Sequence, residues 1–229
     1  MNFKTATLIS KNVLAAKFHD LVFQTEEAFE FEAGQFIVIK INETKMNAYS
    51  IAGKVAENKF GLLIDTDPGG LGSQMIEAMK VGDKIQFSGP SGHMTLKDDG
   101  STELIFMAVT SGIAPMKALV EEALMVKKWS LPMTLYFGVR YCSDVFWNEY
   151  FDRLSRQYPN FKFVLTLSKP DENWQGCGGY ITEIMKAEKQ DLSHAAAYIC
   201  GNAKMTDEAV EILVSKNCPR QRIYFEKYG

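Results

Sequence analysis

The chain of 229 residues has no long apolar run. No stretch approaches the roughly 18 consecutive apolar residues that a membrane-spanning helix needs, so no membrane span is expected. The opening Met1-Asn2-Phe3-Lys4 leads into alternating polar and apolar positions rather than the apolar region of a secretion signal. A cytoplasmic location is therefore the expectation.

Cysteine and histidine are also scarce and widely spread. The four cysteines and three histidines are Cys142, Cys177, Cys200 and Cys218, with His19, His93 and His194. None of the cysteines has the short C-x-x-C spacing that builds zinc or iron–sulfur sites, so no metal is expected. For the histidines we expect surface or helix-capping positions.

A strong charge imbalance is absent too. The 25 basic and 28 acidic residues give a net charge of -3, and the basic residues do not form a run. This argues against a nucleic-acid-binding protein. Hydrophobic residues make up 46% and charged residues 23%, which is typical of a soluble globular protein, and the length allows two domains.

The first hundred residues consist of short β-type segments separated by turns. Expected strands cover residues 3–8, 16–25, 35–41, 49–52, 59–65 and 84–88, with one short helix at 73–79. Breakers such as Asp67-Pro68-Gly69-Gly70 and Gly89-Pro90-Ser91-Gly92 separate them. Many short strands at close spacing predict a small antiparallel barrel or sandwich.

After a polar connection at 97–101, strands alternate with helices. Strands are expected at 104–109, 133–139, 161–167, 197–200 and near 222–225, and helices at 114–127, 146–157, 181–187 and 204–216. This order predicts a doubly wound parallel sheet with its ligand at the carboxyl ends of the strands. The predicted fold class is thus β plus α/β, with domains at 1–100 and 101–229.

One turn in the second domain has the form of an anion site. The apolar strand Leu104 to Val109 passes through Thr110-Ser111-Gly112 directly into a helix. Backbone N–H groups at such a joint, together with the helix dipole, favour an anion such as a dinucleotide pyrophosphate. Many α/β domains have similar joints that bind nothing, so a purely structural turn is an equal alternative for this motif alone.

Four separated motifs occur in a characteristic order: Ala48-Tyr49-Ser50, Gly70-Leu71-Gly72-Ser73, Ser111-Gly112-Ile113-Ala114-Pro115 and Cys200-Gly201-Asn202-Ala203-Lys204-Met205. Together they resemble the ferredoxin–NADP reductase superfamily over nearly the whole chain. Within it, the sequence is similar to two-domain flavin reductases and oxygenase reductases. The resemblance implies an FAD-binding barrel followed by an NAD(P)-binding domain, without an iron–sulfur domain.

On the flavin side, the resemblance places Ala48, Tyr49 and Ser50 at the isoalloxazine. The Tyr49 ring would pack on the flavin, and Ser50 would lie near the atom that accepts hydride; an ordinary strand aromatic is the alternative for Tyr49. Asn47 stands where the family has arginine, so pyrophosphate binding is expected to be weaker unless Lys45 or Lys54 compensates. FAD is the expected cofactor, with FMN also compatible.

The phosphate clamp of the family matches Gly70, Gly72 and Ser73. The resemblance implies that a helix begins against the pyrophosphate and that its backbone amides and the serine hydroxyl bind the phosphates. Ser73 could equally be a plain helix N-cap, and the two roles are compatible.

On the nucleotide side, Thr110 replaces the first glycine of the family's turn and Ser111 replaces a threonine, whereas Gly112 and Pro115 are retained. The Thr110 side chain is expected to narrow the approach to the nucleotide. The resemblance places Arg140 near the adenosine-side phosphates or ribose.

The choice between NADH and NADPH stays open. Asp144 would favour NADH by binding ribose hydroxyls, whereas Arg140 would favour the extra phosphate of NADPH. A surface salt bridge is an equal alternative for both residues.

The last two motifs are expected at the nicotinamide and the flavin. The resemblance places Cys200, Gly201, Asn202 and Met205 at a strand end beside the nicotinamide, where the Cys200 thiol would position the ring; a small buried thiol is the alternative. The terminal segment brings Glu226 and Tyr228 toward the flavin. Ser50, Cys200 and Glu226 are the candidate catalytic residues.

These motifs predict a flavin-dependent NAD(P)H oxidoreductase. Hydride would pass from nicotinamide to flavin, and the electrons would then leave to a separate acceptor, either a protein or a free small molecule. Two alternatives are a reductase that uses flavin as a diffusible substrate and an electron-transfer or regulatory subunit without independent turnover.

Overall fold

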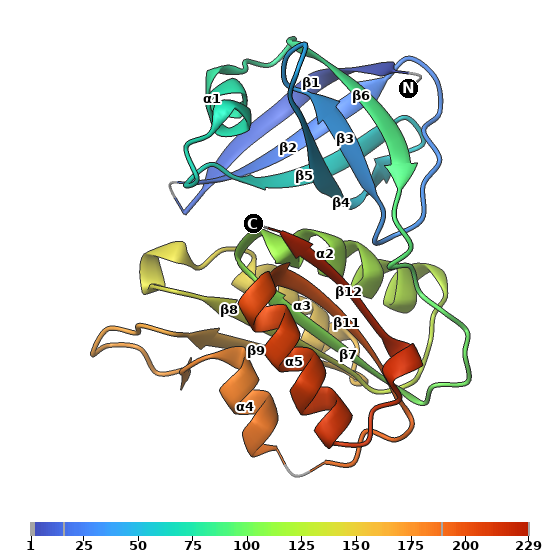
Figure 1. The fold of residues 1–229 in the computed structure, drawn as a ribbon, viewed down its shortest axis with the longest axis vertical. Helices are drawn as coiled ribbons and strands as arrows, with labels where there is room; N and C mark the ends of the chain where they lie inside the picture. Colours follow the sequence, from blue (N-terminus) through green and yellow to red (C-terminus); the bar gives the residue numbers. More distant parts are fainter. Residues whose placement is uncertain (1–2, 16, 189, 229) are drawn as a thin grey trace.

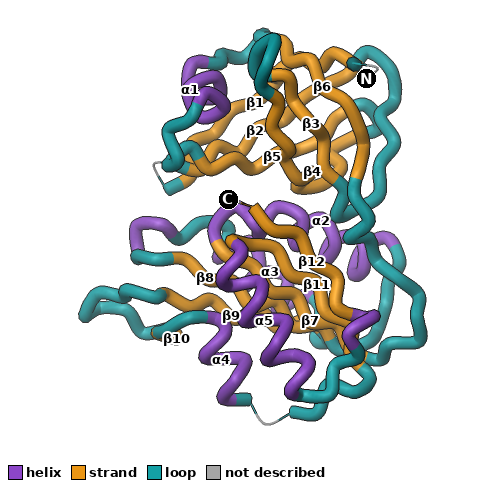
Figure 2. Tube along the Cα trace, viewed as in Figure 1, coloured by secondary structure: helices purple, strands orange, loops and turns teal. Residues whose placement is uncertain are grey.

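The computed structural model describes residues 3–15, 17–188 and 190–228, which form two stacked domains (Figure 1). The first is a closed six-stranded antiparallel barrel, and the second is a six-stranded parallel sheet flanked by helices (Figure 2). The predicted fold class is confirmed. The boundary predicted near residue 100 falls in the segment between the last barrel strand and the first strand of the parallel sheet.

The barrel closes in the order β1-β2-β5-β4-β3-β6. Its strands are β1 (Lys4–Leu14), β2 (Phe18–Thr25), β3 (Phe36–Lys40), β4 (Met46–Ala56), β5 (Lys59–Asp65) and β6 (Lys84–Ser91), and helix α1 (Leu71–Ala78) connects β5 to β6. Alternate residues point inward, and the rings of Phe29, Phe60 and Phe87 pack against one another in the barrel core. Closure pairs every strand on both sides, so the barrel has no free edge.

The parallel sheet has the order β10-β9-β8-β7-β11-β12. Its strands are β7 (Glu103–Val109), β8 (Met133–Val139), β9 (Phe161–Leu167), β10 (Cys177–Gly178), β11 (Ala195–Asn202) and β12 (Ile223–Tyr228). Its helices are α2 (Ile113–Glu121), α3 (Asn148–Gln157), α4 (Ile181–Ala187) and α5 (Ala203–Ser215). Residues of α2 and α3 share one core with Phe106, and residues of α4 and α5 share another with Ile105. Helices therefore cover both faces.

Several element boundaries differ from the sequence prediction. The strand predicted from residue 16 begins at Phe18, and residue 16 itself lies outside the described residues. The helix predicted over 114–127 is α-helical only to Glu121 and continues as a π-helix, Glu122–Val126. Helix α3 begins after Trp147, whose left-handed φ of 55° breaks the helical run. The short strand β10 was not predicted.

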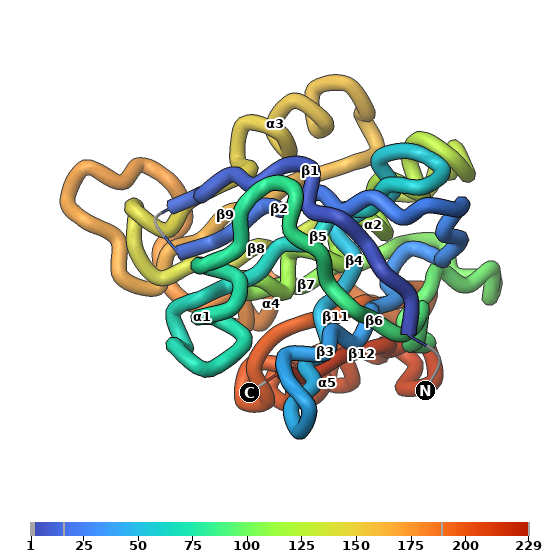
Figure 3. Tube along the Cα trace, turned by 90° about the horizontal axis from the view of Figure 1, so that it is seen from above, coloured from blue at the N-terminus to red at the C-terminus, as the bar shows by residue number. Residues whose placement is uncertain are grey.

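Besides the separate core of the barrel, one hydrophobic cluster contains residues of both domains. Barrel residues Phe18, Ala52 and Met94 belong to the same buried cluster as Leu119 of α2. Figure 3, viewed from above, shows α2 beside β4, and Lys117 of α2 donates a hydrogen bond to the Ala52 carbonyl at 3.3 Å. This contact packs α2, the helix that follows β7, directly against the barrel.

Candidate functional site

Helix α1 begins against strand β4 at a point of very close contact. The Asn47 side-chain amide donates a hydrogen bond to the Tyr49 hydroxyl at 3.1 Å. A Cβ atom on Gly72 would lie 2.3 Å from the Asn47 Nδ2 and 2.6 Å from the Tyr49 hydroxyl oxygen. Any side chain at position 72 would force the Asn47 amide or the Tyr49 hydroxyl to shift. Burial raises the pKa of Tyr49, while the hydrogen bond from Asn47 lowers it, so the phenol stays protonated.

The first turn of α1 has the donors that a phosphate group requires. Its N-cap is Gly70, no side chain caps it, and the first turn contains no acidic residue. The leading N–H groups of such a helix have no intrahelical partner and favour an anion. Ser73 is buried in this turn but is not the N-cap, which corrects the simple capping alternative. These donors fit the pyrophosphate of FAD.

Of the two lysines considered as replacements for the missing arginine, only Lys54 has an acidic partner for its side chain among the described residues. Lys54 pairs with Glu30 at 3.4 Å on the outside of the barrel. Lys45 lies in the exposed turn between β3 and β4, where its backbone N–H binds the Asn42 side chain. Asn47 therefore faces Tyr49 and α1 without an arginine's charge.

Ser50 of the barrel and Glu226 of β12 meet at the domain junction. The Ser50 hydroxyl hydrogen-bonds the Glu226 carboxyl group, and Gly92 lies so close that its Cβ would be 3.1 Å from the Glu226 Oε1. Burial raises the pKa of Glu226 to about 7, although the bond from Ser50 acts in the opposite direction. This carboxyl group can therefore hold or release a proton near neutral pH.

Cys200 lies directly across from Glu226 in the pairing of β11 with β12. Its side chain is buried, and burial, with a smaller effect of the Glu226 charge, raises the pKa of the thiol. A Cβ on Gly112 would lie 2.2 Å from the Cys200 carbonyl oxygen, so the turn after β7 packs directly on the end of β11. The thiol is a neutral packing group here rather than a thiolate nucleophile.

The side chains of Thr110 and Tyr228 are hydrogen-bonded to each other at the carboxyl ends of β7 and β12. The Tyr228 hydroxyl donates to the Val109 carbonyl at 2.7 Å, and the Thr110 hydroxyl lies 2.5 Å from the Tyr228 oxygen. Thr110 has a φ of 47°, the left-handed conformation that suits the glycine it replaces. Ser111 continues this turn as part of a 3-10 helix, and Pro115 is buried in the first turn of α2.

Residues Cys200 to Met205 form the joint between strand β11 and helix α5. Asn202 caps α5, because its side-chain oxygen accepts a hydrogen bond from the Met205 N–H at 3.0 Å. A Cβ on Gly201 would lie 2.1 Å from the Met205 Cε and 2.8 Å from a methyl group of Val109. Gly201 thus lets β7, β11 and α5 meet closely at the sheet edge.

A cavity of about 840 Å³ opens at the carboxyl ends of β7, β8, β9 and β11. Among the predicted residues, Thr110, Arg140, Asn202 and Met205 line it. Its cationic lining residues are Arg140, Lys169 and Lys204. The carboxyl groups of Glu183 and Glu208 line it as well. A large cavity with cationic groups at this edge of a parallel sheet fits a dinucleotide.

Sequence reasoning missed Lys169 and Lys204 as cavity residues. Lys169 follows the end of β9 just as Arg140 follows the end of β8, and Lys204 lies in the first turn of α5. The position of Lys169 after a predicted strand was the signal that could have identified it.

Asp144 does not line this cavity, in contrast to the prediction for it. It is only 7% exposed, accepts a hydrogen bond from the Tyr141 N–H at 3.2 Å, and lies 3.3 Å from the Lys17 ammonium group of the barrel. The salt-bridge alternative describes its placement, because the carboxylate is already paired. Arg140 instead lies at the cavity with its guanidinium group 5.1 Å from the Tyr141 ring centroid.

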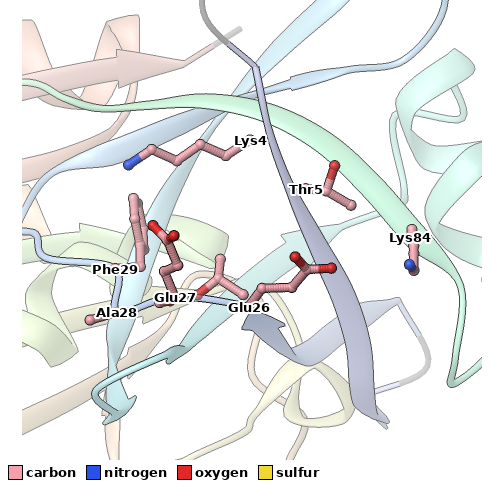
Figure 4. A pocket seen from close by; sticks show the side chains of 8 residues that line it. Lys4, Thr5, Glu26, Glu27, Ala28, Phe29 and Lys84 are labelled. Carbon is pink, nitrogen blue, oxygen red and sulfur yellow. Dashed lines mark hydrogen bonds between the residues drawn. The ribbon is translucent and has the colours of Figure 1, made fainter.

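A second cavity, of about 380 Å³, lies on the barrel where the loop after β2 passes β1 and β6. Figure 4 shows Lys4, Lys84, Glu26 and Glu27 around it together with Phe29. It contains none of the predicted site residues. Its lining mixes charges of both signs, and the Lys4 ammonium group lies 5.0 Å from the centroid of the Phe29 ring.

The surface or capping position expected for the histidines is wrong for His19. This residue is buried in β2, and its Nδ1 has no hydrogen-bond partner among the described residues.

In residues 3–15, 17–188 and 190–228, no helix has the length and apolar character needed to cross a bilayer. No group of three or more potential metal-ligating side chains occurs within the same ranges.

A closed barrel with an open helix N-terminus, joined to a parallel sheet with a large cavity at its carboxyl edge, is an architecture that fits a two-domain protein for a flavin and a pyridine nucleotide. Comparison with known proteins agrees. The family described as oxidoreductase FAD-binding domain matches residues 2–96, and that described as oxidoreductase NAD-binding domain matches residues 106–211. The chain belongs to the ferredoxin–NADP reductase superfamily.

Curated relatives include two kinds of electron-transfer component. Over 171 residues, 72% of this chain, it is 33% identical to a subunit of the Na(+)-translocating NADH-quinone reductase of Methylococcus capsulatus, covering 42% of that protein. Over 230 residues, 97% of the chain, it is 28% identical to the phenol hydroxylase P5 protein of Acinetobacter pittii, covering 65% of that protein. The chain thus spans about half the length of its quinone reductase relatives.

Solved structures show the same fold at low sequence identity. The Amycolatopsis cytochrome P450 reductase GcoB superposes with a TM-score of 0.90 at 24% identity, over 99% of this chain and 69% of that one. A ferredoxin NADP+ reductase from Neisseria gonorrhoeae with bound FAD and NADP superposes with a TM-score of 0.86 at 20% identity, over 99% of each chain.

Proposed function

We propose that the protein passes hydride from NADH or NADPH to bound FAD and delivers the electrons to a separate acceptor. The observation that carries this proposal is the convergence of Ser50, Cys200 and Glu226 from both domains. Ser50 comes from barrel strand β4, whereas Cys200 and Glu226 come from the neighbouring strands β11 and β12 of the parallel sheet. Hydride transfer needs the two rings to be held at such a junction.

In this proposal, the residues of each domain have separate binding tasks. Tyr49 and the first turn of α1, with Gly70, Gly72 and Ser73, hold the flavin, and Arg140 and Asn202 hold the nucleotide. When bound, FAD supplies the hydride acceptor and then the electron donor. The chain's own contribution is to orient the two cofactors and to exclude water from the space between them.

Glu226 and Ser50 are proposed to control a proton at the junction. A carboxyl group with a pKa of about 7 carries a proton part of the time at neutral pH, and the Ser50 hydroxyl provides a path for it. Cys200 keeps its proton and contributes a small neutral surface. Tyr228 is hydrogen-bonded to Val109 and Thr110, and in this proposal it moves aside when the nucleotide binds.

The acceptor is proposed to be a separate protein or a small molecule. The relatives named as a subunit of a quinone reductase and as a phenol hydroxylase component support electron delivery to a partner. The cytoplasmic location stays a prediction from the sequence.

An anaerobic titration tests the main proposal. The purified chain, loaded with FAD, is expected to show flavin absorbance that bleaches when NADH or NADPH is added. If one nucleotide bleaches the flavin at a lower concentration than the other, this establishes the preference between NADH and NADPH, which the sequence does not decide. Flavin absorbance that stays unchanged with both nucleotides would contradict the proposed function.

Asn47 favours a second candidate, in which flavin is a diffusible substrate. Without the arginine, the pyrophosphate loses a bidentate, charged partner. A protein that is colourless after purification and oxidises NAD(P)H only with added flavin would support this candidate. Ferricyanide reduction tests the other alternative, a subunit without turnover of its own. If that alternative holds, the flavin-loaded chain should not reduce ferricyanide rapidly when NAD(P)H is supplied.

A further inference from the structure

The carboxyl end of helix α1 is bound by a lysine that is far away in the sequence. Lys11 of β1 donates hydrogen bonds to the carbonyl groups of Ile76 at 2.7 Å, Glu77 at 2.8 Å and Met79 at 2.9 Å. All three protons of one ammonium group are thus used on one helix end. Figure 1 shows α1 as a short helix packed on the outside of the barrel.

Helix α1 has no stabilising end residues of its own. No side chain caps its N-terminus, its first turn contains no acid, and its last turn contains no base. The helix is only eight residues long, about 12 Å, so it would be marginal without external support. Lys11 supplies the positive charge that a helix carboxyl end favours, and it fixes that end to the barrel wall.

His19 does not provide a second cation beside the Lys11 ammonium group. Burial, and then the Lys11 charge, lowers the pKa of His19, so this imidazole is neutral at pH 7, whereas the Glu77 charge acts in the opposite direction. The Glu77 side chain itself is exposed to solvent. Among these neighbours, the positive charge at the end of α1 comes from Lys11.

We propose that Lys11 is a positioning residue for the flavin pyrophosphate, acting through helix α1 from the end opposite to the phosphate. It holds the helix so that Gly72 stays against Asn47 and Tyr49. It also neutralises the negative end of the helix dipole, which leaves the positive end at Gly70 to Ser73 uncompensated. This effect is important because Asn47 brings no charge to the same site. The inference rests on the proposed binding of FAD.

The test compares the affinities of the apoprotein for FAD and for riboflavin, which lacks the pyrophosphate. In Lys11→Met, which keeps the length of the chain but removes the charge and the donors, the Kd for FAD is expected to rise about fivefold to tenfold. The Kd for riboflavin should change less than about twofold, and Lys11→Arg should restore most of the FAD affinity. Quenching of flavin fluorescence measures both constants.

Lys84→Met is the matched control, because it removes one positive charge from the exposed side of a neighbouring barrel strand. Its FAD affinity should equal that of the wild type. If Lys11→Met does not fold, Lys11→Gln, which keeps two donors without the charge, is expected to show a smaller rise in the FAD Kd of about threefold.

Three results would overturn the inference. They are an unchanged FAD affinity in the folded Lys11 variant, an equal loss for FAD and riboflavin, and an equal loss in Lys84→Met. A wild-type apoprotein that binds no FAD would instead contradict the proposed function itself, so the two failures are distinguishable.

Discussion

The Thr110 hydroxyl lies 2.5 Å from the hydroxyl oxygen of Tyr228, which itself donates to the carbonyl of the residue before Thr110. A residue that replaces glycine in a left-handed turn thereby binds the aromatic ring at the end of the last strand. The same side chain that strains the turn, and that also lines the cavity of the second domain, thus ties this turn to the end of β12.

Replacing Thr110 by glycine should ease nucleotide binding. Thr110→Gly removes the strain of the left-handed conformation and the bond to Tyr228, so the KM for the preferred nucleotide should fall about threefold to tenfold. Steady-state ferricyanide reduction measures it. Tyr228→Phe keeps the ring and the strained turn but loses both hydrogen bonds, and should show part of the decrease. An unchanged KM in both variants would contradict the role of this contact.

Adding a methyl group at Gly72 should weaken flavin binding. In Gly72→Ala the new Cβ collides with the Asn47 amide and the Tyr49 hydroxyl, which pushes α1 away from β4. The FAD Kd should rise about tenfold or more, while the free energy of unfolding falls by about 1–2 kcal/mol.

Gly61→Ala is the control, because the nearest atoms to its new Cβ would lie 3.9 Å away. The FAD affinity of this variant should stay near that of the wild type. If both alanine variants lose FAD to the same extent, the close contact at Gly72 is not the cause.

The raised pKa of Glu226 predicts a pH dependence of both rate and stability. Because its pKa is about 7 in the folded state, well above the ordinary value of 4.5, the folded protein binds the proton more tightly than the unfolded chain. The cost of burying the charge is absent below pH 4 to 5 and fully present above pH 7. The free energy of unfolding of the wild type should therefore fall, relative to Glu226→Gln, as the pH rises from 5 to 8.

The rate of flavin reduction should titrate near pH 7 in the wild type, and this titration should be lost in Glu226→Gln. Stopped-flow measurements at constant ionic strength would show it. Ser50→Ala removes the bond that stabilises the charged carboxylate, so the midpoint should move to higher pH. A wild-type profile that is flat between pH 6 and 8 would disprove the assignment.

The Lys17–Asp144 contact predicts a stability effect rather than a change in nucleotide choice. Lys17→Met leaves the buried Asp144 carboxylate without its cation, so the free energy of unfolding should fall by about 1–3 kcal/mol. Lys40→Met breaks an exposed pair with Glu43, which is 89% exposed, and should change stability by less than about 1 kcal/mol. Urea denaturation measures both variants.

Asp144→Asn separates the two interpretations of this residue. If the carboxylate is structural, the substitution should lower stability and leave the ratio of kcat/KM for NADH and NADPH unchanged. A loss confined to NADH would instead restore the role in ribose binding that the sequence suggested.

The sequence predicted the fold because the order of strands and helices depends on local patterns, whereas the flavin and nucleotide residues were expected from the family resemblance. A strand followed by a glycine-containing turn places Thr110 and Asn202 at one sheet edge whatever the details of packing. Gly72 and Gly201 were recognisable as motif members, although the atoms that exclude a side chain from them became visible only in three dimensions.

Contacts between distant segments could not be predicted. Lys11 and the end of α1 are separated by more than sixty residues, and no periodicity links them. Lys17 and Asp144 come from different domains, so the position of Asp144 after Arg140 suggested a ligand contact that the folded chain uses for an ion pair. The left-handed turn at Trp147 lacks the glycine that would have signalled it.

The apolar core that α2 shares with the barrel has a consequence for how the molecule unfolds and moves. Separating the two halves would expose Phe18, Ala52 and Leu119 to water at once, so the chain should melt in one cooperative transition. Rocking of the two domains against each other would expose part of the same cluster to water, so we expect the two domains to move together as one rigid unit.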